Sequence, residues 1–182
     1  MGPAVFFDRD GVLNDPIVIK GKPFSPMRIE EFSLVPEARA SCTRLKKAGF
    51  ALVVVTNQPE VSRGNLEVEE LNAMHEILYQ ELGIDLVMAC PHDSLDECAC
   101  RKPLPGMLVE ASKTLEIRLD KSWLIGDRWK DIAAGEATGC QTIFLDRGYD
   151  EEKPVSQNFT RSTLKDAVDT VLRNFSLPNE EF

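Results

Sequence analysis

Two acidic residues stand where a short apolar run near the N-terminus ends. Val5-Phe6-Phe7 is followed by Asp8 and Asp10, and then by Gly11. If the extended backbone continues past Phe7, both carboxylates leave the same face of a strand. Such a pair is stable when a cation lies between its members, or when one member keeps its proton and the two divide the roles of nucleophile and acid. A plain turn is the alternative, because the spacing does not fit a calcium loop.

Other polar residues that suit the same chemistry follow later apolar runs or lie close to them. The candidates are Thr56, Asn57, Gln58, Arg63, Arg101, Lys102, Asp127, Arg128 and Asp131. Hydrolysis of a phosphate monoester needs a nucleophile, an acid for the leaving oxygen, and positive charge around the phosphoryl oxygens. This set of residues offers each of these groups.

We expect Asp8 to attack phosphorus and form an aspartyl-phosphate. Asp10 can protonate the leaving alkoxide and then deprotonate the hydrolytic water. Asp127 and Asp8 are expected to hold Mg²⁺, which takes hard oxygen ligands. Lys102 supplies a point charge for the phosphoryl group, and Thr56 supplies a hydroxyl donor.

Arg101 and Arg128 are candidates to hold a second anionic or polar part of the substrate. Each of these basic residues, taken alone, also fits a solvated surface side chain. Asp131 either orients the site or caps the helix that follows Asp127, and both roles stay open. His75 lies on an otherwise charged stretch and is expected at the surface.

Three thiols and an imidazole lie within eleven residues, at Cys90, His92, Cys98 and Cys100. A Cys₃His set is a usual tetrahedral environment for zinc, and with all four positions filled by protein the zinc should be structural. Chance clustering of small buried residues is the alternative. Such a site would fix the loop that leads into Arg101 and Lys102.

Length and charge restrict the function further. The 182 residues are expected to form a single domain, 1–182. Lys and Arg number 21 against 30 Asp and Glu, and the net charge of −9 argues against nucleic acid or an anionic membrane as partner. No apolar run approaches the ~20 residues that span a bilayer. We therefore expect a cytoplasmic monomer that acts on a small phosphorylated metabolite.

Strand and helix patterns alternate along the chain. After the opening strand, residues 15–35 predict a two-stranded flap or an ordered loop, and about 176–182 a frayed tail. The expected strands are 50–55, 84–89, 123–125 and 142–145, and the expected helices 36–47, 66–82, 105–117, 130–138 and 164–175. This alternation predicts an α/β fold, a mainly parallel sheet with helices on both faces. The polar clusters that follow strands would then converge beyond one edge of the sheet.

Four segments resemble the four motifs of the haloacid dehalogenase (HAD) superfamily phosphatases. They are Asp8-Arg9-Asp10-Gly11-Val12, Thr56-Asn57-Gln58, Arg101-Lys102-Pro103, and Gly126-Asp127-Arg128 with Asp131. Together with the Cys-x-His and Cys-x-Cys pairs, they are similar to the subgroup of D-glycero-D-manno-heptose 1,7-bisphosphate and histidinol-phosphate phosphatases. The resemblance covers residues 4–147.

The resemblance implies a Rossmann-like (HAD-like) fold without a large cap domain. The flap near residues 15–30 and the zinc-binding loop 90–100 would shield the site. It also implies the catalytic roles given above, with Mg²⁺ at Asp8, the Asp10 backbone and Asp127. Residues expected to contact substrate are Asn57, Gln58, Arg63, Arg101 and Arg128.

The choice of substrate depends on smaller features. Arg63-Gly64 and residues 105–108 resemble the heptose branch, whereas the short zinc loop and Arg128 resemble the histidinol-phosphate branch. Pro59-Glu60 departs from the Ser-Gly of the heptose branch, and an acid there could alter contacts to a sugar or repel a second phosphate. We favour removal of the 7-phosphate from the heptose bisphosphate. Histidinol phosphate and a third sugar phosphate are the alternatives.

A catalytically silent, zinc-stabilised binding scaffold is the hypothesis from another class. Such a protein would hold an anionic ligand or a protein partner. It has no need of a nucleophile and an acid together, so the presence of Asp8, Asp10, Lys102 and Asp127 argues against it.

Overall fold

The fold centres on a six-stranded sheet with the order β5-β4-β1-β6-β7-β8, in which every neighbouring pair is parallel. A computed structural model of the chain describes residues 2–175, so the tail expected to fray lies outside the described residues. The strands are β1 Ala4–Phe7, β4 Ala51–Asn57, β5 Leu86–Cys90, β6 Trp123–Gly126, β7 Gln141–Leu145 and β8 Phe159–Arg161. The prediction of an α/β fold with a mainly parallel sheet is confirmed.

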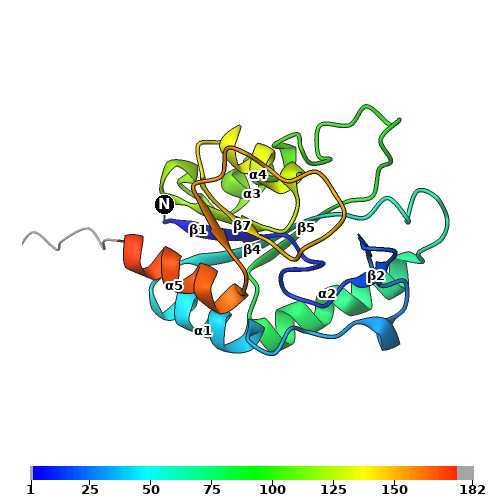
Figure 1. Ribbon diagram of the computed structural model, residues 1–182, viewed down its shortest axis with the longest axis horizontal. Coiled ribbons are helices and arrows are strands. Elements are labelled where there is room, and N and C mark those ends of the chain that lie inside the picture. Colours follow the sequence, from blue (N-terminus) through cyan, green and yellow to red (C-terminus); the bar gives the residue numbers. More distant parts are fainter. Residues whose placement is uncertain (1, 176–182) are drawn as a thin grey trace, which may run out of the picture.

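Helices cover both faces of this sheet (Figure 1). They are α1 Ala38–Lys47, α2 Val68–Leu82, α3 Gly106–Thr114, α4 Trp129–Glu136 and α5 Leu164–Asn174. Successive side chains of a strand point to opposite faces, so Val5 and Phe7 join one hydrophobic core with α1, α2 and α5. Ala4 and Phe6 join a second core with α3 and α4. Because β1 is buried on both faces, it is apolar throughout.

Local sequence sets the ends of several helices. The Thr163 hydroxyl accepts a hydrogen bond from the Asp166 backbone N–H at 3.0 Å and caps the start of α5. Gly83 ends α2 in the left-handed conformation at φ 63°, which glycine adopts at little cost. These signals place the helix ends within a few residues of the positions expected from the sequence.

Two features of the sheet differ from the sequence prediction. β8 is a sixth strand, and its three residues are too short to show a period. Phe159 in β8 stacks on Trp123 with ring centroids 5.9 Å apart, so tertiary packing supports this strand. β4 also continues through Asn57, two residues beyond the expected end.

The strand order reverses beside β1, which pairs with β4 on one side and with β6 on the other. Ligands of open α/β sheets bind beyond the carboxyl ends of the strands at such a point. Asp8 follows β1 and Asp127 follows β6, so the topology brings these two acids to one crevice. The fold therefore positions the acids that the sequence separates by more than a hundred residues.

A short hairpin lies over this edge. β2 Ile17–Ile19 and β3 Lys22–Phe24 pair antiparallel and form the two-stranded flap that the sequence predicts. The Gly21 carbonyl at its turn accepts a hydrogen bond from the Asp150 backbone N–H at 2.9 Å. The flap is thereby joined to the loop that follows β7. Among the described residues, no helix combines the length and apolar character needed to cross a bilayer.

Candidate active site

The predicted site residues meet around one cavity of about 310 Å³ at the carboxyl ends of β1, β4 and β6. This volume falls at the small end of the range usual for ligand sites, roughly 300–1,000 Å³. Its lining includes Asp8, Asp10, Thr56, Asn57, Arg63, Arg101, Lys102, Asp127, Arg128 and Asp131. Of the candidates named from the sequence around this site, Gln58 alone is absent from the lining.

A buried lysine bridges two acids at the floor of the cavity. The Lys102 ammonium lies 2.9 Å from Asp8 Oδ1 and 2.6 Å from Asp131 Oδ1, and it donates to the Val55 carbonyl at 2.7 Å. Burial by itself would lower the pKa of Lys102, but attraction by Asp131 and Asp8 outweighs it and raises the pKa. The cation therefore stays charged beside Asp8.

Burial raises the pKa of Asp8 to about 6, and repulsion by Asp131 adds to the effect while Lys102 opposes it. Oδ1 of Asp8 accepts from the Arg9 backbone N–H at 2.8 Å as well as from Lys102. Among residues 2–175 no hydrogen bond reaches Oδ2. This oxygen is the one free to act on a ligand.

Asp127 is buried, and neither of its carboxylate oxygens forms a hydrogen bond of good geometry in the described part of the chain, although the Tyr149 hydroxyl is close enough to lower its pKa. Burial raises its pKa well above the ordinary value, and repulsion by Asp8 and Asp131 contributes. Oxygens of Asp8, Asp127 and Asp131 all lie within 4.8 Å of one another. Carboxylate oxygens this close together fit a divalent cation such as Mg²⁺, although both oxygens of Asp131 are already bonded, to Lys102 and to the Arg128 backbone N–H.

Gly11 makes this arrangement possible. It has φ +86°, and a Cβ at this position would overlap Asp127 Oδ2. Any other residue would therefore displace the Asp127 carboxylate from its present position. Gly11 therefore allows the turn after Asp10 and also leaves room for the Asp127 carboxylate.

The carboxylate of Asp10 is held very differently, by five hydrogen bonds. Arg9 Nε and Nη2 donate to it at 3.0 and 3.1 Å, and the donors Asn14 Nδ2, Ser25 Oγ and Gln58 Nε2 lie at 3.0, 2.8 and 2.9 Å. Burial opposes ionisation, but the Arg9 charge and these donors prevail and lower the pKa of Asp10. β1 ends at Phe7 and the chain then turns, so the condition under which both carboxylates would leave one face of a strand, an extended backbone through Asp10, is not met.

Arg9 is fully buried behind Asp10, and its guanidinium lies over the Phe32 ring at 5.5 Å. Its Nη1 is 3.5 Å from His75 Nε2. His75 is 8% exposed, so the expectation that it lies at the surface is wrong. Burial and the adjacent Arg9 charge lower the pKa of His75 to about 4, and the imidazole is neutral.

In the segment Thr56-Asn57-Gln58, the side chains of Asn57 and Gln58 form hydrogen bonds with neighbouring residues of the site. Gln58 is fully buried and donates to Asp10 Oδ2 and, at 2.9 Å, to Thr56 Oγ1. Asn57 exchanges two hydrogen bonds of 3.0 Å with the Lys102 backbone. The Gln58 amide therefore contacts the candidate acid and does not line the cavity that would hold substrate.

The three predicted arginines each have a protein partner. Arg63 pairs with Asp93 and Glu60, and Arg128 pairs with Glu151 at 2.6 Å. Arg101 donates to the His92 carbonyl at 2.9 Å and so joins the cavity to the cysteine-containing loop. Asp131 both pairs with Lys102 and accepts from the Arg128 backbone N–H at 3.0 Å at the start of α4, which answers the question that the sequence left open.

Several residues that line the cavity escaped the sequence prediction. Lys130 on the first turn of α4 lines it and forms no ion pair within residues 2–175. Burial, together with Arg128 and Arg101, lowers the pKa of Lys130. Ser25 and Glu151 also line the cavity. These residues lie in a flap, a helix turn and a loop, where no apolar run ends in a polar cluster.

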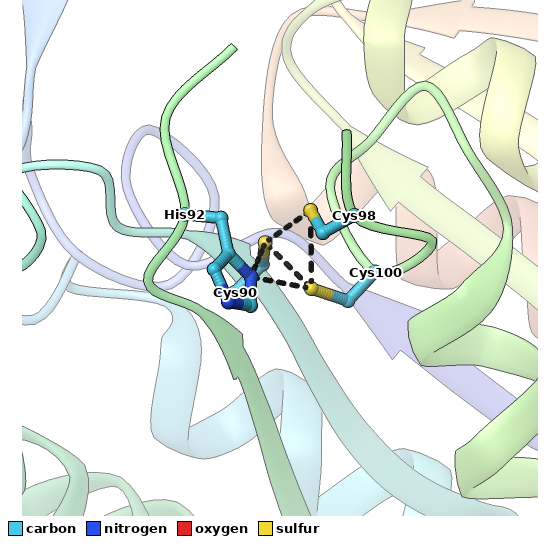
Figure 2. A group of neighbouring side chains, drawn as sticks. All are labelled: Cys90, His92, Cys98 and Cys100. Atoms are coloured by element: carbon cyan, nitrogen blue, oxygen red, sulfur yellow. Dashed lines mark hydrogen bonds between the residues drawn. The ribbon is translucent and has the colours of Figure 1, made fainter. Parts of the chain in front are cut away.

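The three cysteines and His92 converge as the sequence predicts, and Figure 2 shows their side chains pointing toward one another. Contacts among the three sulfur atoms and His92 Nδ1 are 2.8–3.6 Å. Four ligands about 2.0–2.3 Å from a zinc ion would be roughly 3.5–3.8 Å apart. No disulfide links the five cysteines, and Cys90 is the last residue of β5. The set therefore fits zinc in its donor types and nearly in its size.

Comparison with known proteins agrees with this geometry. Residues 99–174 match the HAD-hydrolase-like family model. The D-glycero-beta-D-manno-heptose-1,7-bisphosphate 7-phosphatase of Yersinia pestis is 36% identical over 157 residues, 80% of each chain. The enzyme of the same name from Escherichia coli K12 is 33% identical over 179 residues, 92% of this chain and 91% of its own.

Two solved structures of phosphatases are also similar to this chain. The D,D-heptose 1,7-bisphosphate phosphatase from B. bronchiseptica, complexed with magnesium and phosphate, superposes with a TM-score of 0.77. It is 26% identical, and the match covers 95% of this chain and 99% of the other. A putative HAD-like phosphatase from Mesorhizobium loti is 30% identical, with a TM-score of 0.74 and coverage of 98% and 89%.

Proposed function

Since the chain belongs to the HAD-like hydrolases, in the family of the D-glycero-beta-D-manno-heptose-1,7-bisphosphate 7-phosphatases, we propose that it removes the 7-phosphate of that bisphosphate by way of an aspartyl-phosphate on Asp8. The observation that carries this proposal is the charge arrangement at the cavity floor. Lys102 is buried against Asp8, and Asp127 presents unsatisfied oxygens beside them. A site built only to hold an anion would not bury three acids there.

In the first half of the reaction, Asp8 attacks phosphorus through its free oxygen while the bond from phosphorus to the sugar oxygen breaks. Lys102 holds the nucleophile in place and balances charge on the phosphoryl oxygens, and the Thr56 hydroxyl can donate to them. Asp10 gives a proton to the leaving oxygen. Its pKa is lowered in the ligand-free chain, but the negative charge of an entering phosphoryl group favours uptake of that proton.

In the second half, Asp10 is again a carboxylate and takes a proton from water. The water oxygen attacks phosphorus and the bond from phosphorus to Asp8 breaks, which releases phosphate and restores the nucleophile. Mg²⁺, held by Asp8, Asp127 and the backbone of Asp10, would supply a Lewis acid that offsets the charge of the acids and of the phosphoryl group. Asp131 is engaged by Lys102, so its role is to hold that lysine.

The charged side chains around the mouth of the cavity favour a bisphosphate over histidinol phosphate, whose free amine is a cation. We call this part of the lining the rim, and it consists of Glu60, Arg63, Arg101, Arg128, Lys130 and Glu151. The rim carboxylates of Glu60 and Glu151 are already paired with Arg63 and Arg128. Lys130 has no such partner in the described part of the chain, and Arg101 donates only to a carbonyl. The unmatched charge at the rim is therefore positive, which suits a second phosphate.

We propose that Cys90, His92, Cys98 and Cys100 hold a structural zinc ion. The closeness of the four side chains supports this, as does the absence of a disulfide among the five cysteines. Free thiols also suit the reducing cytoplasm, which we propose as the compartment. Through the bond from Arg101 to the His92 carbonyl, the zinc loop would fix the rim of the cavity.

A panel of phosphate esters tests the function. Phosphate release would be measured, with and without Mg²⁺, from the heptose 1,7-bisphosphate, histidinol phosphate and other sugar phosphates, and compared by kcat/KM. We expect Mg²⁺-dependent release with the highest kcat/KM for the heptose bisphosphate. A higher value for histidinol phosphate would contradict the substrate, and no release from any ester would contradict the activity.

A further inference from the structure

Ser25 is the flap residue that contacts the candidate acid. It follows β3 directly, lines the cavity, and its hydroxyl donates to Asp10 Oδ2 at 2.8 Å. The flap itself is held over the site by the bond between the Gly21 carbonyl and the Asp150 N–H. Ser25 therefore links a covering element to the group that must exchange a proton.

The other donors to Asp10 differ from Ser25 in one chemical respect. Arg9, Asn14 and Gln58 present guanidinium or amide N–H groups, which can only donate, and packing fixes their direction. A hydroxyl donates and accepts, and turning about its C–O bond moves its hydrogen without moving any heavy atom. Oδ2 receives three of the donors, from Ser25, Gln58 and Arg9 Nη2. A proton on Oδ2 needs one of them to withdraw, and only Ser25 can do so by rotation.

We propose that Ser25 is a positioning residue for the acid step, an inference that rests on the proposed phosphatase function. While Asp10 carries its proton, the Ser25 hydrogen is turned away from Oδ2. As the bond from Asp8 to phosphorus forms and the bond from phosphorus to the leaving oxygen breaks, the proton passes from Asp10 to that oxygen. The Ser25 hydroxyl then donates to the carboxylate that forms, while its own proton stays on its oxygen throughout.

This role predicts that the effect of Ser25 depends on the leaving group. An alkoxide leaves poorly without a proton, whereas p-nitrophenolate leaves without one. A hydrogen bond to a charged group contributes about 1.5–3 kcal/mol, so its loss from the acid step costs roughly 10- to 100-fold in rate. The value of kcat/KM reports the step in which the phosphoryl group moves to Asp8, and therefore isolates this effect.

The test compares kcat/KM of the wild type and of Ser25→Ala with two substrates, the heptose 1,7-bisphosphate and p-nitrophenyl phosphate, in the presence of Mg²⁺. We expect a loss of roughly 10- to 100-fold for the sugar ester and little change for the aryl ester. Ser25→Thr keeps the hydroxyl and should restore much of the loss. Thermal melting of each variant verifies that the fold is retained.

Ser62→Ala is the matched control, because Ser62 is exposed and its hydroxyl donates to the Pro59 carbonyl at 3.0 Å, with no other partner among residues 2–175. It should behave as the wild type with both esters. Equal losses for both esters in Ser25→Ala, or no loss for either, would overturn the role of Ser25 while leaving the phosphatase function intact. A wild type inactive toward both esters would overturn the function and this inference together.

Discussion

Gly11 illustrates how closely the backbone approaches the proposed magnesium site. We expect Gly11→Ala to abolish Mg²⁺-dependent stabilisation and activity, because the new methyl group would displace Asp127. Its positive φ adds a strain of about 1 kcal/mol. Thermal melting with and without Mg²⁺ measures the loss of metal binding.

Gly64→Ala is the control that separates the backbone strain of a positive φ from the overlap of a new methyl group with Asp127. Gly64 also has a positive φ, +72°, but no atom lies within 4 Å of the Cβ it would acquire. This variant should lose a little stability and keep its response to Mg²⁺. If both alanine variants respond to Mg²⁺ like the wild type, Gly11 does not shape the metal site.

The raised pKa of Asp8 predicts how Mg²⁺ binding depends on pH. In the metal-free protein this pKa is about 6, so the folded state holds a proton that the unfolded state has already lost. The stability this proton contributes is present at low pH and is lost as pH rises through about 6. A cation competes with that proton. The rise in melting temperature caused by Mg²⁺ should therefore be small at pH 5 and large at pH 8, and a rise that is independent of pH would contradict the assignment.

At the residue scale, the sequence predicted those groups whose types and positions follow from strand ends. Asp8, Thr56 and Asp127 come where apolar runs stop, and the sheet brings such positions together. Ser25 and Lys130 gave no comparable signal, because their closeness to the site depends on how a flap and a helix turn are placed. The burial of His75 was missed because its partner, Arg9, is distant in sequence.

The loop that carries Cys90, His92, Cys98 and Cys100 is the element whose order we expect to depend on a metal, because we propose that it holds zinc. Removal of zinc by a chelator selective for it, with Mg²⁺ in excess, should lower the melting temperature and the activity, because binding of a structural metal is coupled to folding. Metal analysis should give about one zinc per chain in the wild type and less in Cys100→Ser. Cys140→Ala, which changes a buried cysteine outside the loop, should keep its zinc. A folded and fully active protein without zinc would contradict the proposal.

At the level of helices and strands, the spacing of apolar residues and the residues typical of helix ends predicted the five helices and five of the six strands of the main sheet. Long apolar runs and glycines mark these elements without tertiary information. β8 could not be found in this way, since its pairing with β7 and its packing on Trp123 stabilise a segment of only three residues. The flap was predicted, but not its bond to Asp150.

At the scale of the whole molecule, a chain of net charge −9 concentrates unmatched positive charge at one rim. Lys130 and Arg101 provide it, while other lining arginines are neutralised by carboxylates. The lining of the cavity carries six basic and six acidic side chains, so a small anion meets less repulsion there than over the rest of this acidic chain. The monomeric state expected from the sequence stays a prediction.

The proposed phosphatase mechanism requires Asp8 to act as the nucleophile within a site assembled from distant segments. The most direct measurement is the rate of phosphate release from the heptose 1,7-bisphosphate by Asp8→Asn with saturating Mg²⁺. The variant should fold at least as well as the wild type, because it removes a buried carboxylate whose pKa is raised by burial and by Asp131. Asp120→Asn, which changes an exposed carboxylate that pairs with Arg118 and does not line the cavity, is the control. We predict release at the background rate for Asp8→Asn and at the full rate for the control. A folded Asp8→Asn with a rate near that of the wild type would contradict the role of Asp8 as nucleophile.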